Sequence, residues 1–243
     1  MKISIIIPAY NEGKTIKNII NEIKKVDYNG NEIEIVIIND GSTDNTGKVL
    51  EGIRDKNIRV FNKINEGKGS AIIEGLKHAL GEIVVIQDAD MEYSPSQIPG
   101  LVKPIQDKRT KVVYGSRFLG NIENMQLPNV IANRLLTAMN NIFYNKNITD
   151  ACTCYKILDA KLIKSFNLKD NGFDICQEIT SNVFKRDINI LEIPIHYTAR
   201  SGKEGKKAKW WTLFKGMWAI IRYRFSSSTA NNSNTKARTK GIK

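Results

Sequence analysis

Ile83-Val84-Val85-Ile86-Gln87-Asp88-Ala89-Asp90 joins an apolar run to two aspartates that stand one residue apart. The run predicts a short buried strand, because β-branched residues without polar alternation are typical of strands covered on both faces. In extended chain, side chains at i and i+2 point the same way, so both carboxylates are expected on one face, with the small Ala89 between them. Hard oxygen ligands of this kind suit Mg²⁺ or Mn²⁺. We therefore predict that Asp88 and Asp90 hold a divalent cation that carries a diphosphate.

Similar apolar runs occur four more times in the first half of the chain and predict further strands. They are Ile3–Ile7, Ile33–Ile38, Ile58–Phe61 and Val112–Tyr114. Helical patterns alternate with the early runs: one follows Asn11, a second begins in Ser42-Thr43-Asp44, and a third covers about 69–80 before Gly81. This alternation predicts an α/β domain with a mostly parallel sheet and helices on both faces.

The second half of the chain has a different pattern. Ser94-Pro95 predicts a short or kinked helix before the alternation stops at Gly120. A long helix is then expected over 129–144, with an apolar face formed by Ile131, Leu135, Met139, Ile142 and Phe143. A loop at 149–155, a helix near 174–186 and a strand at 188–197 follow.

The composition limits the possible classes of protein. Hydrophobic residues make up 41% and charged residues 26% of the 243 residues, as in ordinary globular proteins. Three cysteines, Cys152, Cys154 and Cys176, leave no even set of disulfides and fit a reducing compartment. No signal peptide is visible after Met1, and no stretch approaches the ~20 apolar residues of a membrane span.

Nearly all the net charge of +12 lies at the C-terminal end. Residues 1–199 hold 25 Lys and Arg against 24 Asp and Glu, whereas residues 200–243 hold 12 against Glu204 alone. Such an end could meet nucleic acid, an anionic membrane surface or an anionic substrate. Over 209–225, aromatic and aliphatic residues interleave with lysines and arginines, which predicts a basic amphipathic helix in a lipid interface. Packing of its apolar face on the protein's own sheet is the alternative, and 226–243 is expected to be a disordered tail.

Polar motifs end two further strands. Pro8-Ala9-Tyr10-Asn11-Glu12 follows the first, and Asn39-Asp40-Gly41-Ser42-Thr43-Asp44 follows the second. Ligands gather beyond the carboxyl ends of strands in open α/β sheets. We expect Asp40 to accept hydrogen bonds from a base or ribose, Tyr10 to lie against a base, and Lys68 to reach a phosphate. Each also has a plainer interpretation as a turn, packing or surface residue.

These motifs together resemble the family 2 glycosyltransferases with the GT-A fold, and most closely the dolichol- or polyprenyl-phosphate mannose synthases. The resemblance extends from residue 3 to about residue 225. Besides the three strand ends, its matching segments are Asn65-Glu66-Gly67-Lys68-Gly69, Tyr114-Gly115-Ser116-Arg117-Phe118, Thr149-Asp150, Thr153-Cys154-Tyr155-Lys156, Ile193-Pro194 and Arg200-Ser201-Gly202-Lys203-Glu204-Gly205-Lys206-Lys207.

The resemblance implies roles for specific residues. A catalytic domain at 1–208 would divide into a nucleotide-sugar and metal half at 1–120 and an acceptor half at 121–208. The residues implied at the nucleotide sugar are Pro8, Ala9, Tyr10, Glu12, Asp40, Lys68, Asp88 and Ala89. The implied metal ligands are Asp88, Asp90 and Glu92, although some members carry Gln in place of Glu92. The residues implied at the acceptor phosphate are Arg117, Arg134, Arg200 and Lys206.

Asp150, Arg117 and Arg200 are the catalytic candidates that the resemblance implies. Asp150 would act as a base or as an acid that orients the acceptor, with capping of the next helix as the structural alternative. Glu178 is a weaker candidate and more consistent with a structural role.

The expected activity is that of an inverting glycosyltransferase. It would move a hexose from GDP-mannose or UDP-glucose to polyprenyl or dolichyl phosphate, with Mg²⁺ or Mn²⁺, at the cytoplasmic face of an anionic membrane. Because a lipid phosphate is already anionic, arginines rather than a strong base would hold it in line. Transfer to a saccharide or another lipid is the alternative enzyme activity. Nucleic-acid binding is disfavoured, because the acids at the strand ends would repel phosphate unless a metal intervened.

Overall fold

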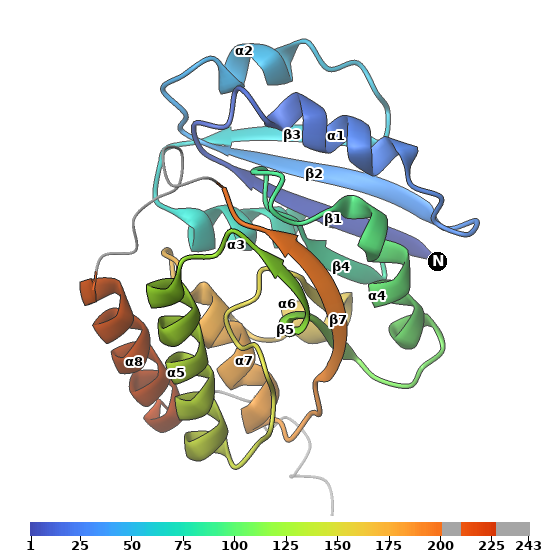
Figure 1. Cartoon of the computed structure of the whole chain (residues 1–243). Coiled ribbons are helices and arrows are strands. Elements are labelled where there is room, and N and C mark those ends of the chain that lie inside the picture. The colour runs from blue at the N-terminus through green and yellow to red at the C-terminus, as the bar shows by residue number, and fades with distance from the viewer. Residues whose placement is uncertain (201–209, 227–243) are drawn as a thin grey trace, which may run out of the picture.

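The computed structural model describes residues 1–200 and 210–226, and its strands form one sheet (Figure 1). The strand order is β3-β2-β1-β4-β6-β5-β7. All neighbours are parallel except β6, which runs antiparallel to both β4 and β5. The strands are β1 (Lys2–Ala9), β2 (Glu32–Asp40), β3 (Ile58–Lys63), β4 (Ile83–Ile86), β5 (Val112–Glu123), β6 (Lys156–Asp159) and β7 (Leu191–Thr198).

Helices cover both faces of this sheet, as the alternation predicts. The helices are α1 (Ile16–Lys25), α2 (Thr46–Glu51), α3 (Lys68–His78), η1 (Pro95–Gln97), α4 (Ile98–Gln106), α5 (Leu127–Tyr144), α6 (Ala160–Lys164), α7 (Ile175–Lys185) and α8 (Trp210–Phe225). Helices α1, α2 and α4 share one hydrophobic core with the sheet, and α3, α6 and α7 share the other.

The isoleucines of β1 show why the sequence of this strand is apolar at successive positions. Ile5 and Ile7 point into the core below α1, whereas Ile6 points into the core below α3. Gly75 of α3 lies so close to the sheet that a Cβ there would be 2.5 Å from Cγ2 of Ile6. Burial on both faces therefore holds the polar ends of β1, β2 and β4 at one edge of a rigid sheet.

The five predicted strands and the three early helices are confirmed. Helix α3 ends at His78, because the backbone of Ala79 is already extended, so Gly81 does not stop the helix. Strand β6 and helix α6 have no counterpart in the predicted elements. The expected boundary at residue 120 falls inside β5, so the two predicted halves share one sheet.

The C-terminal helix α8 packs on two other helices rather than on the sheet (Figure 1). Helix α8 contacts α5 and α7, its residues Gly216, Ala219 and Ile220 are buried, and a Cβ on Gly216 would meet Leu136 of α5 at 3.0 Å. Within the described residues, no helix is both long and apolar enough to cross a bilayer. Lys206 and most of the predicted tail (227–243) lie outside the described residues.

Candidate active site

A cavity of about 820 Å³ opens at the carboxyl ends of β1, β2 and β4 and continues between α5 and α8. Its volume is in the range of sites for medium-sized organic ligands. It brings together most of the residues that the sequence nominates. These are Pro8, Ala9, Tyr10, Glu12, Asp40, Lys68, Asp88, Ala89, Asp90, Glu92, Arg117 and Arg200.

Asp40 holds the loop that follows β3. Its carboxylate accepts hydrogen bonds from the main-chain N–H of Gly67 at 2.8 Å and of Glu66 at 3.2 Å. Lys63 adds an ion pair at 3.0 Å. Gly67 has φ of +107°, a conformation that favours glycine. Contact of Asp40 with a nucleotide base stays a prediction, and the structure assigns this carboxylate a loop-fixing role as well.

The N-terminus of α3 is closed by the chain itself. The N–H groups of Gly69 and Ser70 donate to the carbonyl oxygen of Asn171 at 2.8 and 3.1 Å. The neighbouring Lys68 instead points into the cavity, where Nζ lies 2.6 Å from Asp88 and 3.0 Å from Sγ of Cys154. A phosphate at this site would therefore meet the Lys68 side chain rather than the free amides of a helix end.

Asp88 and Asp90 experience opposite electrostatic environments. Burial works to raise the pKa of Asp88, but the Lys68 ammonium and a hydrogen bond from Cys154 outweigh it, and the pKa is lowered. Burial, followed by repulsion from Asp88 and Glu92, raises the pKa of Asp90 to about 7. The site thus holds more carboxylate charge than its own cations compensate.

The donor set fits a divalent cation that arrives with a diphosphate. Asp88 and Asp90 supply hard oxygens to one cavity, and Mg²⁺ typically binds through one or two carboxylates, substrate phosphates and water. Glu92, the expected third ligand, lines the same cavity, but other residues of this chain engage its carboxylate. It accepts from the hydroxyl of Tyr197 at 2.7 Å and from the guanidinium of Arg200 at 3.4 Å. No group of three His, Cys, Asp or Glu side chains suited to a metal ion occurs in the described part of the chain.

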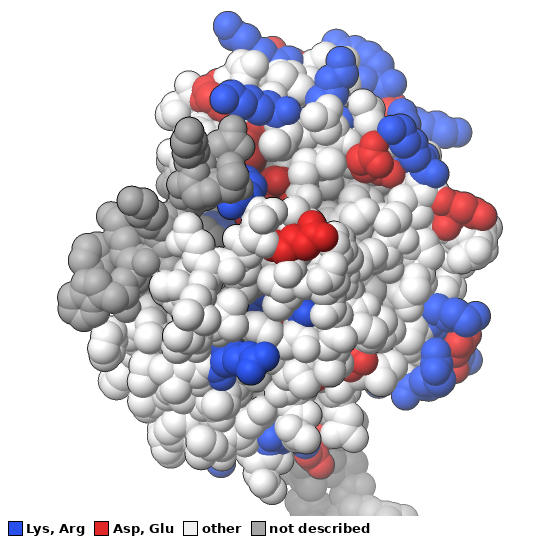
Figure 2. Space-filling model, in the orientation of Figure 1, with Lys and Arg blue, Asp and Glu red and all other residues white. Residues whose placement is uncertain are grey.

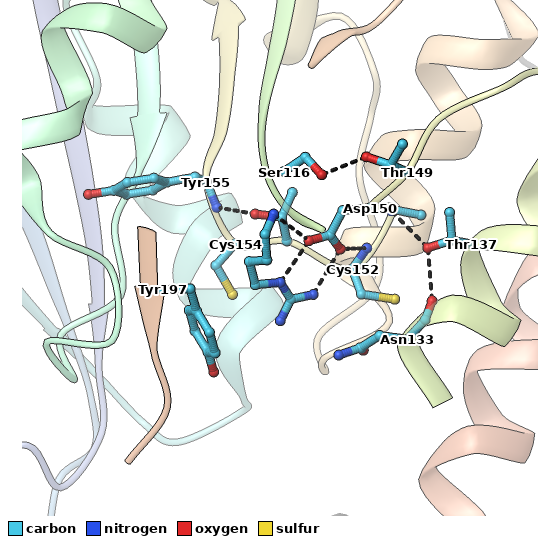
Figure 3. A network of polar contacts seen from close by, with 12 residues as sticks. Ser116, Asn133, Thr137, Thr149, Asp150, Cys152, Cys154, Tyr155 and Tyr197 are labelled. Atoms are coloured by element: carbon cyan, nitrogen blue, oxygen red, sulfur yellow. Dashed lines mark hydrogen bonds and ion pairs between the residues drawn. The ribbon is translucent and has the colours of Figure 1, made fainter. Parts of the chain in front are cut away.

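Arg117 and Asp150, both expected on the acceptor side, form a buried ion pair, and Figure 3 shows Asp150 within its network of polar contacts. Nε and Nη2 of Arg117 lie 2.7 and 2.8 Å from the two oxygens of Asp150. Asp150 is fully buried and does not line the cavity, whereas Arg117 does. A general base must reach the proton that it removes. The geometry therefore favours Asp150 as the acid that orients Arg117 rather than as a base.

Residues that the sequence did not nominate hold the loop of Asp150. Glu192 of β7 accepts from the N–H groups of Thr149 and Asp150 at 2.7 and 2.9 Å. Thr137 of α5 accepts from the N–H of Ala151 at 3.1 Å (Figure 3). Lys156, fully buried in β6, donates to the carbonyl oxygen of Ala151 at 2.9 Å. Of these three residues, only Lys156 belongs to a segment that carries the family resemblance.

The far arm of the cavity is mixed in character. Its apolar lining residues are Met125, Pro128, Ala132, Leu136, Leu213 and Gly216, and the polar residues Gln126, Asn129, Asn133 and Gln177 line the same cavity. Arg134, expected at the acceptor phosphate, does not line it; its guanidinium instead lies 5.1 Å from the centre of the Phe118 ring. Glu178 accepts from the N–H groups of Lys169 and Asp170, which supports a structural role.

Comparison with known proteins identifies the family. Residues 4–166 match the model for glycosyl transferase family 2. The chain belongs to glycosyltransferase family 2. The α/β architecture also matches GT-A glycosyltransferases, such as glucosyl-3-phosphoglycerate synthase from Mycobacterium tuberculosis in complex with Mn²⁺ and UDP-glucose. That match has a TM-score of 0.70 at 21% identity and covers 92% of this chain and 78% of the other. The predicted GT-A fold is confirmed.

Two family 2 relatives act on lipid phosphates according to their names. The UDP-N-acetylglucosamine–dolichyl-phosphate N-acetylglucosaminyltransferase of Methanococcus voltae is 31% identical, over 84% of this chain and 89% of its own. The dolichol-phosphate mannosyltransferase of Pyrococcus furiosus is 29% identical, over 91% of this chain and 63% of its own. This glycosyltransferase therefore resembles enzymes of polyprenyl-phosphate glycosylation, and these two relatives differ from each other in the sugar that they transfer.

Proposed function

We propose that this chain transfers a sugar from a nucleoside-diphosphate sugar to a polyprenyl phosphate with inversion at the anomeric carbon. The single observation that carries the proposal is the continuity of one cavity. It joins the carboxylates of Asp88 and Asp90 to a partly apolar arm between α5 and α8, with Arg117 among its lining residues. A nucleotide sugar and a lipid phosphate need these two environments side by side.

Different residues of the chain would bind the cation and the acceptor phosphate. Asp88 and Asp90 would hold the cation, which when bound neutralises negative charge on the departing diphosphate. Arg117 presents to the acceptor phosphate the N–H groups that Asp150 leaves unused, and the buried ion pair fixes their direction. An oxygen of the acceptor phosphate forms the new bond to the anomeric carbon as the bond to the diphosphate breaks. No proton has to be removed from an ionised phosphate.

Attachment to an anionic membrane surface is part of the proposal. Helix α5 exposes Leu127, Ile131, Leu135 and Ile142, and α8 exposes Trp218 and Phe225. Figure 2 shows a mostly uncharged surface over α5 and the lower part of α8, whereas charged side chains gather over α1 and α2. Apolar side chains with nearby Arg222 and Arg224 are typical of interfacial helices. Contact with the bilayer would place a lipid phosphate near the arm of the cavity between α5 and α8.

The donor sugar stays open between mannose, glucose and N-acetylglucosamine, because the relatives named above differ in it. The test incubates the purified chain with radiolabelled GDP-mannose, UDP-glucose and UDP-N-acetylglucosamine, with and without polyprenyl phosphate and Mn²⁺. We expect label in the organic phase only when lipid phosphate, cation and one donor are all present. Transfer to a saccharide or to a lipid without phosphate would support the alternative acceptor instead.

A further inference from the structure

Besides Asp40, which pairs with Lys63, four carboxylates and two cations line the donor end of the cavity. Glu12, Asp88, Asp90 and Glu92 have side chains that are 12–19% exposed. Lys68 pairs with Asp88, and Arg200 contacts the other three. When all four carboxylates are ionised, they exceed the two cations by two negative charges, which matches the charge of one divalent cation.

The guanidinium of Arg200 bridges three acids that come from distant parts of the chain. Nη2 lies 3.1 Å from Asp90, Nη1 lies 3.4 Å from Glu12, and Nε lies 3.4 Å from Glu92. Arg200 thus contacts one of the two carboxylates that would bind the cation. A guanidinium and a divalent cation on the same carboxylate repel each other, so the two compete for Asp90.

The main chain of Arg200 is fixed while its side chain has room to move. Its N–H donates to Oε1 of Glu92 at 3.1 Å, and the N–H of Thr198 donates to the carbonyl oxygen of Glu92 at 3.2 Å. The side chain of Arg200 is 29% exposed and borders the cavity. It can therefore leave Asp90 without any unfolding of β7, and it would stay within reach of a phosphate bound in the same cavity.

We infer that Arg200 is an exchangeable counter-ion of the cation site, and that Glu92 holds Arg200 rather than the metal. Entry of the cation with its diphosphate displaces the guanidinium from Asp90, and the freed N–H groups turn to phosphate oxygens. Glu92 retains Arg200 through the main-chain N–H, so the exchanged side chain remains at the site. This inference rests on the proposed function for the identity of the phosphates, but the competition itself involves only the cation and this chain.

The experiment titrates the full chain with Mn²⁺ alone, without any nucleotide, and follows free Mn²⁺ by electron paramagnetic resonance. Arg200→Gln is expected to tighten Mn²⁺ binding roughly tenfold, within the usual range of coupling between two sites. Arg200→Lys keeps the charge but loses the planar fork that reaches three acids, so binding should tighten several-fold as well. Asp90→Asn should weaken Mn²⁺ binding strongly. Glu92→Gln should change the affinity by less than about threefold, because loss of the Glu92 charge weakens Mn²⁺ binding while release of Arg200 strengthens it.

Lys63→Gln is the matched control. It removes the same charge at the same edge of the sheet, but from Asp40 rather than from the cation site. The exchange is refuted if Lys63→Gln raises the affinity for Mn²⁺ as much as Arg200→Gln does and Arg200→Lys has the affinity of the wild type. The gain in affinity would then come from the general loss of a positive charge near the site. If Glu92→Gln lost as much affinity for Mn²⁺ as Asp90→Asn, Glu92 would be a metal ligand, and its proposed role of retaining Arg200 would be refuted. The expected order of Mn²⁺ affinities without any sugar transfer would refute the proposed function and leave the exchange standing.

Discussion

The guanidinium of Arg117 and the carboxylate of Asp150 form a two-point ion pair behind the cavity wall, with N–O distances of 2.7 and 2.8 Å. Oδ2 of Asp150 also accepts the main-chain N–H of Arg117 at 3.1 Å. Both side chains are nearly or fully buried, so the direction of the remaining N–H groups of Arg117 is set by the fold.

Arg117→Lys should therefore lower kcat for transfer by about 100-fold, because an ammonium cannot reproduce the planar contact. Affinity for the nucleotide diphosphate should stay within a few-fold of the wild type, as measured by calorimetry. A variant that loses donor affinity and keeps kcat would contradict the assignment of Arg117 to the acceptor side.

Asp150→Asn tests whether this acid orients Arg117 or removes a proton. Asn keeps one hydrogen-bond acceptor for Arg117 but loses the negative charge and the second acceptor. We therefore expect kcat to fall, while the shape of the pH–rate profile stays unchanged. Disappearance of an acidic limb present in the wild type would instead identify Asp150 as a base. Because removal of one partner of a buried pair costs about 3–5 kcal/mol, thermal unfolding must be measured alongside.

Asp88→Asn and Asp90→Asn should each abolish detectable transfer while the far-UV circular dichroism stays that of the wild type. The reason is that the site would keep only one charged carboxylate for the cation. Chelation by EDTA should have the same effect on the wild type and be reversed by added Mn²⁺ or Mg²⁺. Turnover that persists in EDTA would argue against a cation in the reaction.

Ile131→Ser combined with Trp218→Ser should reduce flotation of the chain with anionic vesicles severalfold. These side chains are 57% and 63% exposed on α5 and α8. Leu80→Ser is the matched control, because Leu80 is 67% exposed just after α3, outside these two helices. Equal losses in both proteins would mean that α5 and α8 do not form the membrane-binding surface.

The buried carboxylate of Glu34 makes the free energy of unfolding depend on pH. Burial works to raise its pKa, but hydrogen bonds from Ser4 and the Leu80 N–H, together with Arg59, lower it overall. A lowered pKa stabilises the fold above the unfolded value of about 4.3, and this contribution is lost as pH falls through the folded value. Glu34→Gln should therefore lower the free energy of unfolding by about 1–3 kcal/mol at pH 7. The difference between the two proteins in urea unfolding should shrink below about pH 4, and a constant difference would contradict the charge-based explanation.

The elements that could be predicted are those with a local signal. Strands β1 to β5 each contain a short run rich in apolar, β-branched residues, and the polar groups at three strand ends follow from the geometry of a parallel sheet. Strand β6 has only four residues and begins with Lys156, whose buried position depends on Ala151 and on a cation–π contact 3.5 Å from the Tyr114 ring centre. Neither partner is visible in the local pattern.

Most of the nominated side chains line one cavity, but their pairings could not be predicted from the sequence. Glu92 meets Arg200, which lies 108 residues away, and Asp150 meets Arg117 across 33 residues. Motif spacing cannot reveal which cation approaches which acid, because that depends on how β4, β5 and β7 are arranged in the sheet. The burial of Asp150 has the same origin, since Glu192 of β7 fixes its loop.

Isothermal titration of the chain with GDP-mannose, UDP-glucose and UDP-N-acetylglucosamine, each with Mn²⁺ and with EDTA, tests donor binding at the 88/90 carboxylates most directly. We predict that one nucleotide sugar binds with at least about tenfold higher affinity when Mn²⁺ is present, and that Asp90→Asn removes this gain. Binding of no nucleotide sugar under either condition, or equal binding in Mn²⁺ and EDTA, would contradict the account.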